Sequence, residues 1–265
     1  MSAQQSLQDG NLEDALAQLQ AEVRSDPARA DLRVFLFQLL SVLGEWGRAL
    51  NQLNVAGDLD AETLAMVQTY REVLQCEALR SAIFSGERSP LVFGEPEPWF
   101  AEVINALGLV AKGNLMEAQA ARLRAFEEAP AVSGTLDGDA FAWIADADSR
   151  MGPFLEAIVN GKYYWLPFHR IQAIHIEEPT DLRDLVWLPV HFTWANGGEA
   201  VGLVPSRYPG SEANEESSIR LARATTWQDM GGDEYFGLGQ RMLVTDASEY
   251  SLLNVREILL NCPTD

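Results

Sequence analysis

The chain has 265 residues and is 47% hydrophobic, which allows one large or two ordinary domains with a sizeable core. Its formal charge of −20 opposes the phosphates of nucleic acids and anionic lipids, and no stretch approaches the roughly 20 consecutive apolar residues that span a membrane. The amino terminus also lacks the basic and apolar regions of a secretion signal. The sequence therefore predicts a cytoplasmic protein that binds no nucleic acid and inserts into no membrane.

A short pattern, Gly-x-Leu/Trp-x-x-Ala, occurs three times in the first half of the chain, beginning at Gly10, Gly44 and Gly113. The first two copies are 34 residues apart, and the third lies 69 residues beyond the second. The shorter spacing is typical of tetratricopeptide-like repeats, in which the glycine ends one helix and the alanine lets the next helix pack closely. Because such repeats commonly hold another polypeptide, the pattern indicates a binding protein.

The predicted helices follow from these turns and from the spacing of apolar residues. Segment 31–43 is apolar on nearly every side, so we expect it at the centre of the helical half. Two glycines and three prolines between residues 85 and 98 predict a loop there. The main predicted helices are 12–24, 31–43, 61–84, 99–112 and 115–129.

From residue 131 the hydrophobic pattern changes from helical to alternating, with frequent turn signals. Asp137-Gly138 predicts a hairpin within residues 133–141, and Asn160-Gly161 ends a predicted helix that runs from about Asp146 to Val159. Strands are predicted at 163–168, 171–176, 190–194, 200–205, 219–226 and 240–245, and exposed loops at 208–218 and 231–239.

These elements predict an α+β fold with two domains. Residues 1–130 form a TPR-like α-α superhelix in this prediction. Residues 131–265 form a mostly antiparallel β domain with one or two helices, and five of the seven tryptophans of the chain belong to it. We therefore expect an aromatic core in the second domain.

Four long motifs in this sequence are similar to signatures of one known family. They are Pro90 to Trp99 (PLVFGEPEPW), Phe141 to Arg150 (FAWIADADSR), Asn160 to Phe168 (NGKYYWLPF) and Asp184 to Pro189 (DLVWLP), the last followed by Phe192-Thr193-Trp194. On these motifs the chain resembles the ImpE family, also called TagJ or SciE-type, over essentially its whole length.

The resemblance implies a role in bacterial type VI secretion. It implies an accessory cytoplasmic protein that binds the amino-terminal helix of the small contractile-sheath subunit (TssB/VipA type) and is linked to the disassembly ATPase ClpV. It implies no enzymatic activity. The residues themselves agree with this role, because a helical repeat beside a tryptophan-rich sheet offers grooves in which an amphipathic helix could lie.

Aromatic side chains are the candidates for contacts with such a helix. We favour Trp99, Tyr163, Tyr164 and Trp194 as exposed anchors, since aromatic residues tend to dominate peptide interfaces. The alternative is that each of them packs in the core, where tryptophan and tyrosine are usually substantially buried.

No pattern predicts a catalytic residue, a cofactor site or a metal site. Asp146 and Asp148 fit the amino terminus of the predicted helix better than a metal loop, and His169, His175 and His191 match no ligand spacing. Two alternatives to an adaptor stay open at this point. One is a metal-dependent or hydrolytic enzyme with its site in the second domain, and the other is a scaffold that assembles with itself.

Overall fold

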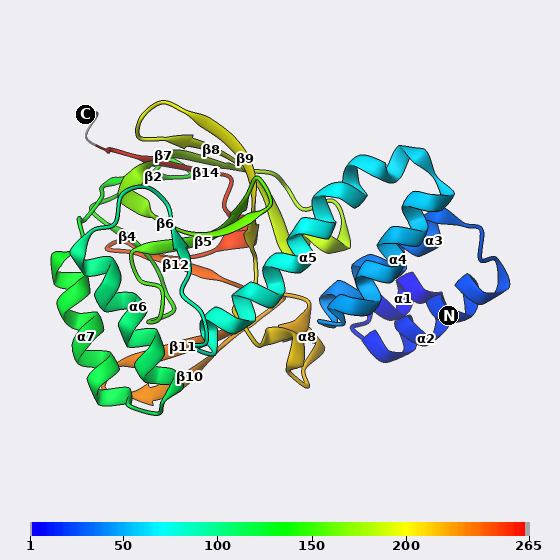
Figure 1. Cartoon of the computed structure of the whole chain (residues 1–265), viewed down its shortest axis with the longest axis horizontal. Coiled ribbons are helices and arrows are strands. Elements are labelled where there is room, and N and C mark those ends of the chain that lie inside the picture. The colour runs from blue at the N-terminus through cyan, green and yellow to red at the C-terminus, as the bar shows by residue number, and fades with distance from the viewer. Residues whose placement is uncertain (1, 263–265) are drawn as a thin grey trace.

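The first half of the chain is helical and the second half is built mainly of antiparallel strands, which confirms the predicted α+β fold (Figure 1). The computed structural model describes residues 2–262. In this part of the chain, no helix is both long and apolar enough to cross a membrane. The helices are α1 Ala3–Gln8, α2 Leu12–Ser25, α3 Ala30–Val42, α4 Trp46–Leu59, α5 Leu64–Phe84, α6 Pro98–Ala111, α7 Leu115–Glu128 and α8 Ser217–Arg220, with a 3₁₀ turn, η1 (Ala61–Thr63), before α5.

Each copy of the Gly-x-Leu/Trp-x-x-Ala pattern forms the turn of a helix pair, as predicted. Gly10 joins α1 to α2, Gly44 joins α3 to α4, and Gly113 joins α6 to α7. The three glycines have φ values of 79°, 71° and 78°, a left-handed conformation that costs least without a side chain. The alanine of each copy is 0% exposed, because the helices approach closely there.

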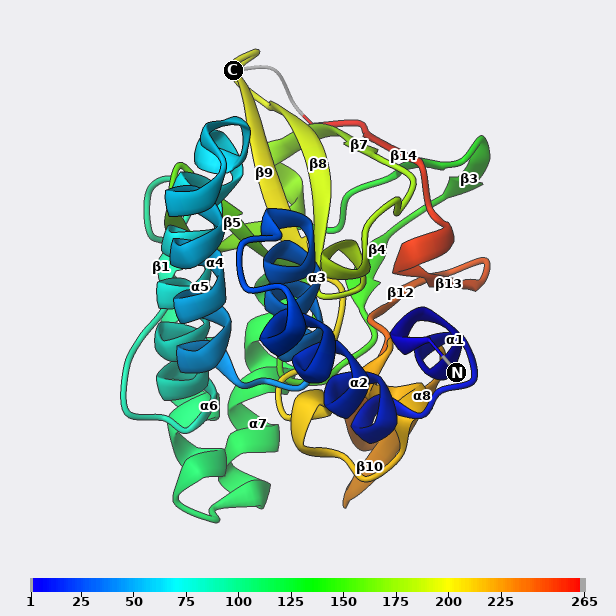
Figure 2. The same ribbon diagram turned by 90° about the vertical axis from the view of Figure 1, so that its right-hand side faces the viewer.

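The strands form one large sheet and two small ones. Their bounds are β1 Leu91–Val92, β2 Gly134–Leu136, β3 Asp139–Phe141, β4 Ile144–Asp146, β5 Phe154–Val159, β6 Lys162–Pro167, β7 Ile171–Ile176, β8 Trp187–Trp194, β9 Glu199–Pro205, β10 Thr225–Gly231, β11 Glu234–Gly239, β12 Met242–Thr245, β13 Glu249–Ser251 and β14 Glu257–Leu260. The large sheet has the order β1-β6-β5-β9-β8-β7-β14-β2-β3, in which only β1 and β6 pair in parallel. The small sheets are β13-β12-β4 and the hairpin β10-β11. Figure 2 shows α3, α4 and α5 in front of the large sheet, while α6 and α7 lie beyond the far end of α5 in Figure 1.

The predicted hairpin on Asp137-Gly138 is present as β2 and β3, but the predicted helix from Asp146 to Val159 is wrong. Strand β4 ends at Asp146, and β5 lies between β6 and β9. All six residues of β5 are buried, so the strand lacks the alternation of a half-exposed strand and resembles a buried helix in sequence. Asp146 and Asp148 are therefore not helix caps, and this interpretation is also wrong.

Two further predictions fail in the last third of the chain. The predicted strand at 219–226 is wrong because most of it belongs to α8 and the turn that follows, and β10 begins only at Thr225. The predicted loop at 231–239 is wrong because β11 occupies most of it. Gly232 and Asp233 have φ values of 65° and 64°, the two positive values that a tight type I′ hairpin turn requires.

The connection between β9 and β10 packs against the helix pairs through arginine side chains. Arg207 Nη1 donates to the carbonyl of Val42, the last residue of α3, at 2.8 Å. Arg223 Nη1 donates to the carbonyl of Gln8, the last residue of α1, at 3.1 Å. Cations are favoured at the carboxyl end of a helix, because its last carbonyl groups have no hydrogen-bond partner inside the helix. The prediction of an exposed loop at 208–218 is thus wrong in part, since its first residue is fully buried.

One of the hydrophobic clusters in the core is shared by the helices and the large sheet, and a second lies among the strands of the second half. Trp187 of β8 lies 5.8 Å from Trp46 of α4 and 5.7 Å from Tyr70 of α5, measured between ring centroids. Strand β1 precedes residue 130 and still joins the large sheet. The division into domains after residue 130 remains a prediction.

Candidate functional site

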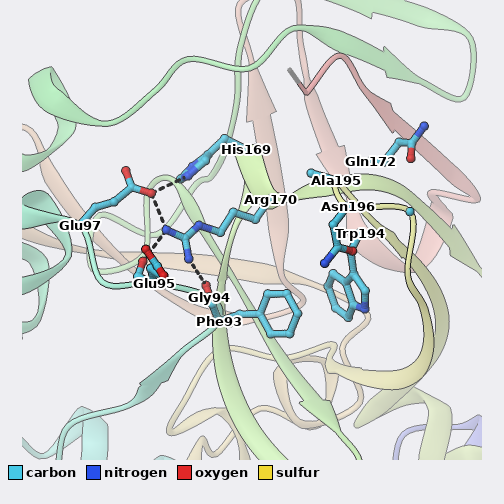
Figure 3. Close-up of a pocket in the computed structure, with 11 residues that line it drawn as sticks. Phe93, Gly94, Glu95, Glu97, His169, Arg170, Gln172, Trp194, Ala195 and Asn196 are labelled. Carbon is cyan, nitrogen blue, oxygen red and sulfur yellow. Dashed lines mark hydrogen bonds and ion pairs between the residues drawn. The ribbon is translucent and has the colours of Figure 1, made fainter. Parts of the chain in front are cut away.

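A pocket of about 770 Å³ opens where the chain segment before α6 meets one end of the large sheet (Figure 3). The segment before α6 supplies one wall, the start of β7 with the 3₁₀ turn η2 (Phe168–Arg170) supplies another, and the β8-β9 turn supplies the rim. The pocket is lined by Phe93, Gly94, Glu95, Glu97, His169, Arg170, Gln172, Trp194, Ala195, Asn196 and Gly197. Both halves of the sequence therefore contribute to it.

Stacked aromatic rings form the apolar side of this pocket. The rings of Phe93 and Trp194 lie 4.3 Å apart at 29°, and Phe192 lies 4.9 Å beyond Trp194 at 12°. Tyr164 meets Phe93 edge-on at 6.1 Å. Such stacks are rigid and bury a large apolar area, so this side of the pocket is formed before any ligand arrives.

The polar side is held by hydrogen bonds across the pocket wall. Glu97 accepts from Arg170 at 2.6 Å and lies 2.9 Å from His169 Nε2, and Arg170 also donates to the Phe93 carbonyl at 2.8 Å. Burial opposes ionisation of Glu97, but these hydrogen bonds together lower the pKa of Glu97. Burial lowers the pKa of His169, so we expect a neutral imidazole at neutral pH. This network fixes the loop that carries Phe93.

The four aromatic residues favoured from the sequence fall into two groups. Trp99 and Tyr163 are 3% and 0% exposed and pack in the core, so the prediction that they are exposed is wrong. Trp194 is only 7% exposed, so the prediction that it is exposed is also wrong, although it lines the pocket, and Tyr164 is half-buried beside it. The spacing in the sequence could not distinguish these positions, because burial depends on strand order. Phe93 was missed as a single residue, although it lies inside a family motif.

The alternative of a metal enzyme finds no geometric support in the part of the chain that the structure describes. Within residues 2–262, no group of three or more His, Cys, Asp or Glu side chains could hold a metal ion. His175 and His191 do lie directly opposite each other on β7 and β8. Each histidine, however, already lies near a carboxylate, His175 at 3.4 Å from Glu257 and His191 at 3.0 Å from Glu177.

Ionisable side chains also cluster in the interior, between α5 and the sheets. Glu156 of β5 accepts from Arg80 of α5 at 2.6 Å and from both Arg241 and the Tyr163 hydroxyl. Arg241 also donates to Asp146. Perturbed ionisable groups often mark catalytic sites, but these five side chains belong to residues at most 5% exposed, where no substrate can reach. We interpret them as a structural cluster that joins the long helix to the sheets.

The cluster predicts an unusual dependence of stability on pH. Burial raises the pKa of Asp146 to about 6, because the charge of Arg241 only partly offsets it. A carboxyl group with a raised pKa holds its proton more tightly in the folded protein, so it stabilises the fold below that pKa and loses this contribution above it. We expect Asp146 to contribute about 1 kcal/mol more to the free energy of unfolding at about pH 5 than at about pH 7.5. Denaturant unfolding at both pH values measures this change.

The Asp146→Asn variant is the control for this pH effect. It removes the titrating carboxyl group and leaves the general charge of the protein almost unchanged. The increase in stability should be smaller by about 1 kcal/mol in the variant than in the wild type. An equal increase in both proteins would show that general charge repulsion, and not Asp146, causes it.

Sequence and fold comparisons show which known proteins this chain is similar to. A family model described as ImpE protein matches residues 138–259. The chain is 50% identical to the type VI secretion system accessory component TagJ of Pseudomonas aeruginosa over 265 residues, which are 100% of this chain and 92% of that protein. It also shares the fold of a crystal structure from Vibrio parahaemolyticus, with a TM-score of 0.89, 23% identity and 98% of each chain covered.

Proposed function

Since this chain belongs to the ImpE/TagJ family of type VI secretion accessory components, we propose that it is a cytoplasmic, non-enzymatic adaptor for the contractile sheath. In this proposal it binds the amino-terminal helix of the small sheath subunit (TssB/VipA type). The bound helix lies in the pocket between Phe93 and the β8-β9 turn. Recognition of an amphipathic helix in an apolar groove is a recurrent binding mode.

The observation that supports this site best is the stack of Phe93 on Trp194 beside a polar wall. An amphipathic helix presents apolar side chains at every third or fourth position, and one or two of them fit a pocket of about 770 Å³. The polar wall and Asn196 at the rim suit the polar flank of the same helix. Glu95 on this wall favours a helix with basic residues on that flank, since Glu97 is already paired with Arg170.

Replacing Phe93 with alanine is expected to weaken binding of the sheath peptide by more than about tenfold, because truncating a central aromatic anchor commonly costs over about 1.4 kcal/mol. Isothermal titration with a synthetic peptide of the sheath subunit's amino-terminal helix measures the change. Trp227→Ala is the matched control, since Trp227 is an aromatic residue 36% exposed on β10, outside the pocket. Unchanged affinity in Phe93→Ala would place the peptide elsewhere, and no saturable binding to the wild type would contradict the adaptor function.

The link to the ATPase ClpV is a second part of the proposal. It requires that one molecule of this protein contact the sheath subunit and the ATPase together. Co-sedimentation of ClpV with assembled sheath, with and without this protein, tests the bridge. The Phe93→Ala variant should fail to increase the amount of ClpV that sediments with the sheath.

A further inference from the structure

We propose that strand β10 binds an extended, basic segment of a protein partner, which joins the β10-β11 hairpin as a third strand. β10 pairs with β11 along one edge only, and in Figure 1 it lies on the outer side of β11. Residues 226–229 of this strand are all exposed. Addition of an extended peptide to an open sheet edge is a recurrent binding mode. None of these residues lines the pocket assigned to the sheath helix.

The register of the hairpin shows which backbone groups of β10 are open. The Gln240 N–H donates to the Ala224 carbonyl at 3.0 Å, and in an antiparallel pair every second residue bonds across in this way. The backbone groups of residues 226 and 228 therefore face β11. Those of the residues between and beside them face outward, and no hydrogen bond within residues 2–262 engages them. We call these outward-facing residues, Thr225, Trp227 and Asp229, the open edge.

The opposite edge of the hairpin is already held by the rest of the protein. In β11 the N–H groups of residues 235, 237 and 239 face away from β10, and all three have oxygen acceptors. They donate, in this order, to Ser149 Oγ at 2.9 Å, Asp148 Oδ2 at 2.8 Å and Ser211 Oγ at 2.7 Å. The hairpin is thus attached through β11, and β10 is the edge that remains for a partner.

The length of β10 distinguishes it from the edge strands of the other two sheets. The large sheet ends in β1 and β3, of two and three residues, and the β13-β12-β4 sheet ends in strands of three residues. Very short edge strands prevent pairing with other chains. β10 has seven residues, of which 225–229 precede the bulge. Because an isolated pair of strands is only marginally stable, a third strand on β10 also stabilises the hairpin.

The side chains of the hairpin indicate a basic partner. The hairpin contains Asp229, Asp233 and Glu234 but no lysine or arginine. Glu234 pairs with Arg122 of α7, whereas the exposed Asp229 and Asp233 form no ion pair within the described residues. A basic side chain opposite Asp229 and an apolar one opposite Trp227 suit this edge. A second copy of this chain would bring its own charge of −20, so we favour a different protein.

The test uses the synthetic pentapeptide acetyl-Arg-Thr-Val-Thr-Thr-amide, aligned antiparallel with its arginine opposite Asp229 and its valine opposite Trp227. In this alignment the valine N–H donates to the Trp227 carbonyl, and the N–H of the threonine after it points to solvent. N-methylation of the valine should weaken binding at least about fivefold, and N-methylation of that threonine less than about twofold. Equal effects of the two methyl groups would overturn the pairing. Replacing the arginine by glutamate should weaken binding several-fold, and unchanged affinity would overturn the basic partner.

Amide hydrogen exchange of the full chain, followed by NMR, locates the peptide. Saturable protection is expected at the open edge, while the amides of Thr226 and Gln228, which already bond to β11, should change little. Absence of saturable protection at the open edge would overturn the proposal. Protection without peptide that increases with protein concentration would also overturn it, because a second copy would then hold the edge.

Two variants at one position test the backbone of the open edge. Trp227→Ala keeps the outward N–H, and Trp227→Pro removes it without touching a bond to β11, since proline is tolerated where the N–H of an edge strand faces solvent. Trp227→Pro should bind the pentapeptide at least about fivefold more weakly than Trp227→Ala. Unchanged exchange at Thr226 and Gln228 shows that the hairpin is intact, and equal affinities would then contradict the proposal. If proline opens the hairpin, the two methylated peptides decide with the wild type.

Discussion

The Glu156→Gln variant is expected to lose about 3 to 5 kcal/mol of the free energy of unfolding, since it leaves two buried guanidinium groups without their shared carboxylate. Glu156 is 0% exposed and lies between Arg80 and Arg241. Burial alone would raise the pKa of Glu156, but the charges of these arginines lower it to about 2. The carboxylate is therefore ionised throughout the neutral range. A melting temperature about 10 °C lower, or a matching shift in denaturant unfolding, measures the loss.

An exposed ion pair provides the control for this variant. Glu102 pairs with Arg124 at 2.9 Å, but their side chains are 42% and 60% exposed. Solvent screens such a pair, so Glu102→Gln should change stability by less than about 1 kcal/mol. Equal effects of the two substitutions would show that the interior cluster adds no more than a surface pair. The helix α5 would then need another explanation for its attachment to the sheets.

Local signals predicted the parts of the fold that depend on neighbouring residues. The glycines at residues 10, 44 and 113 ended helices as expected, because a left-handed turn requires only the local backbone. Asp137-Gly138 predicted its hairpin for the same reason, with φ values of 49° and 92°. These features could be read directly from short stretches of sequence.

Other features depend on residues far apart in the chain. Arg80, Glu156 and Arg241 form one cluster, yet nothing in the local pattern around any of them indicates a partner. The all-buried strand β5 was mistaken for a helix because both of its faces are covered, one by the hydrophobic cluster shared with the helices and the other by the cluster among the strands. Such contacts are set by strand order, which a single sequence does not specify.

In the candidate site, too, the sequence predicted the local features but not those set by distant parts of the chain. The family resemblance predicted a helix-binding protein and pointed to motifs that contain Phe93 and Trp194. The sequence could not predict whether an aromatic residue faces a pocket or the core, because this depends on how the sheet packs. In the folded protein, Trp99 and Tyr163 lie in the core.

Replacing Gly44 with alanine is expected to destabilise the protein by about 2 to 5 kcal/mol. A φ of 71° strains any residue with a side chain by about 1 to 2 kcal/mol. A Cβ atom at this position would also lie 2.5 Å from Cγ and 2.8 Å from Cβ of Glu212, so the connection between β9 and β10 would have to move. Overpacking of this kind costs about 1 to 3 kcal/mol more. Denaturant unfolding measures the total.

Two other glycines separate the two causes of this loss. Gly113 has the same role and a φ of 78°, but a Cβ atom there would meet nothing within 4 Å, so Gly113→Ala should show the backbone strain alone. Gly47 lies inside α4 with equally open space and no positive φ, so Gly47→Ala should be neutral or stabilising by up to about 1 kcal/mol. An additional loss in Gly44→Ala over Gly113→Ala would measure how tightly the second half of the chain packs on the first helical turns. Equal losses at both glycines would mean that backbone strain alone causes the loss at Gly44 and that the contact with Glu212 adds nothing.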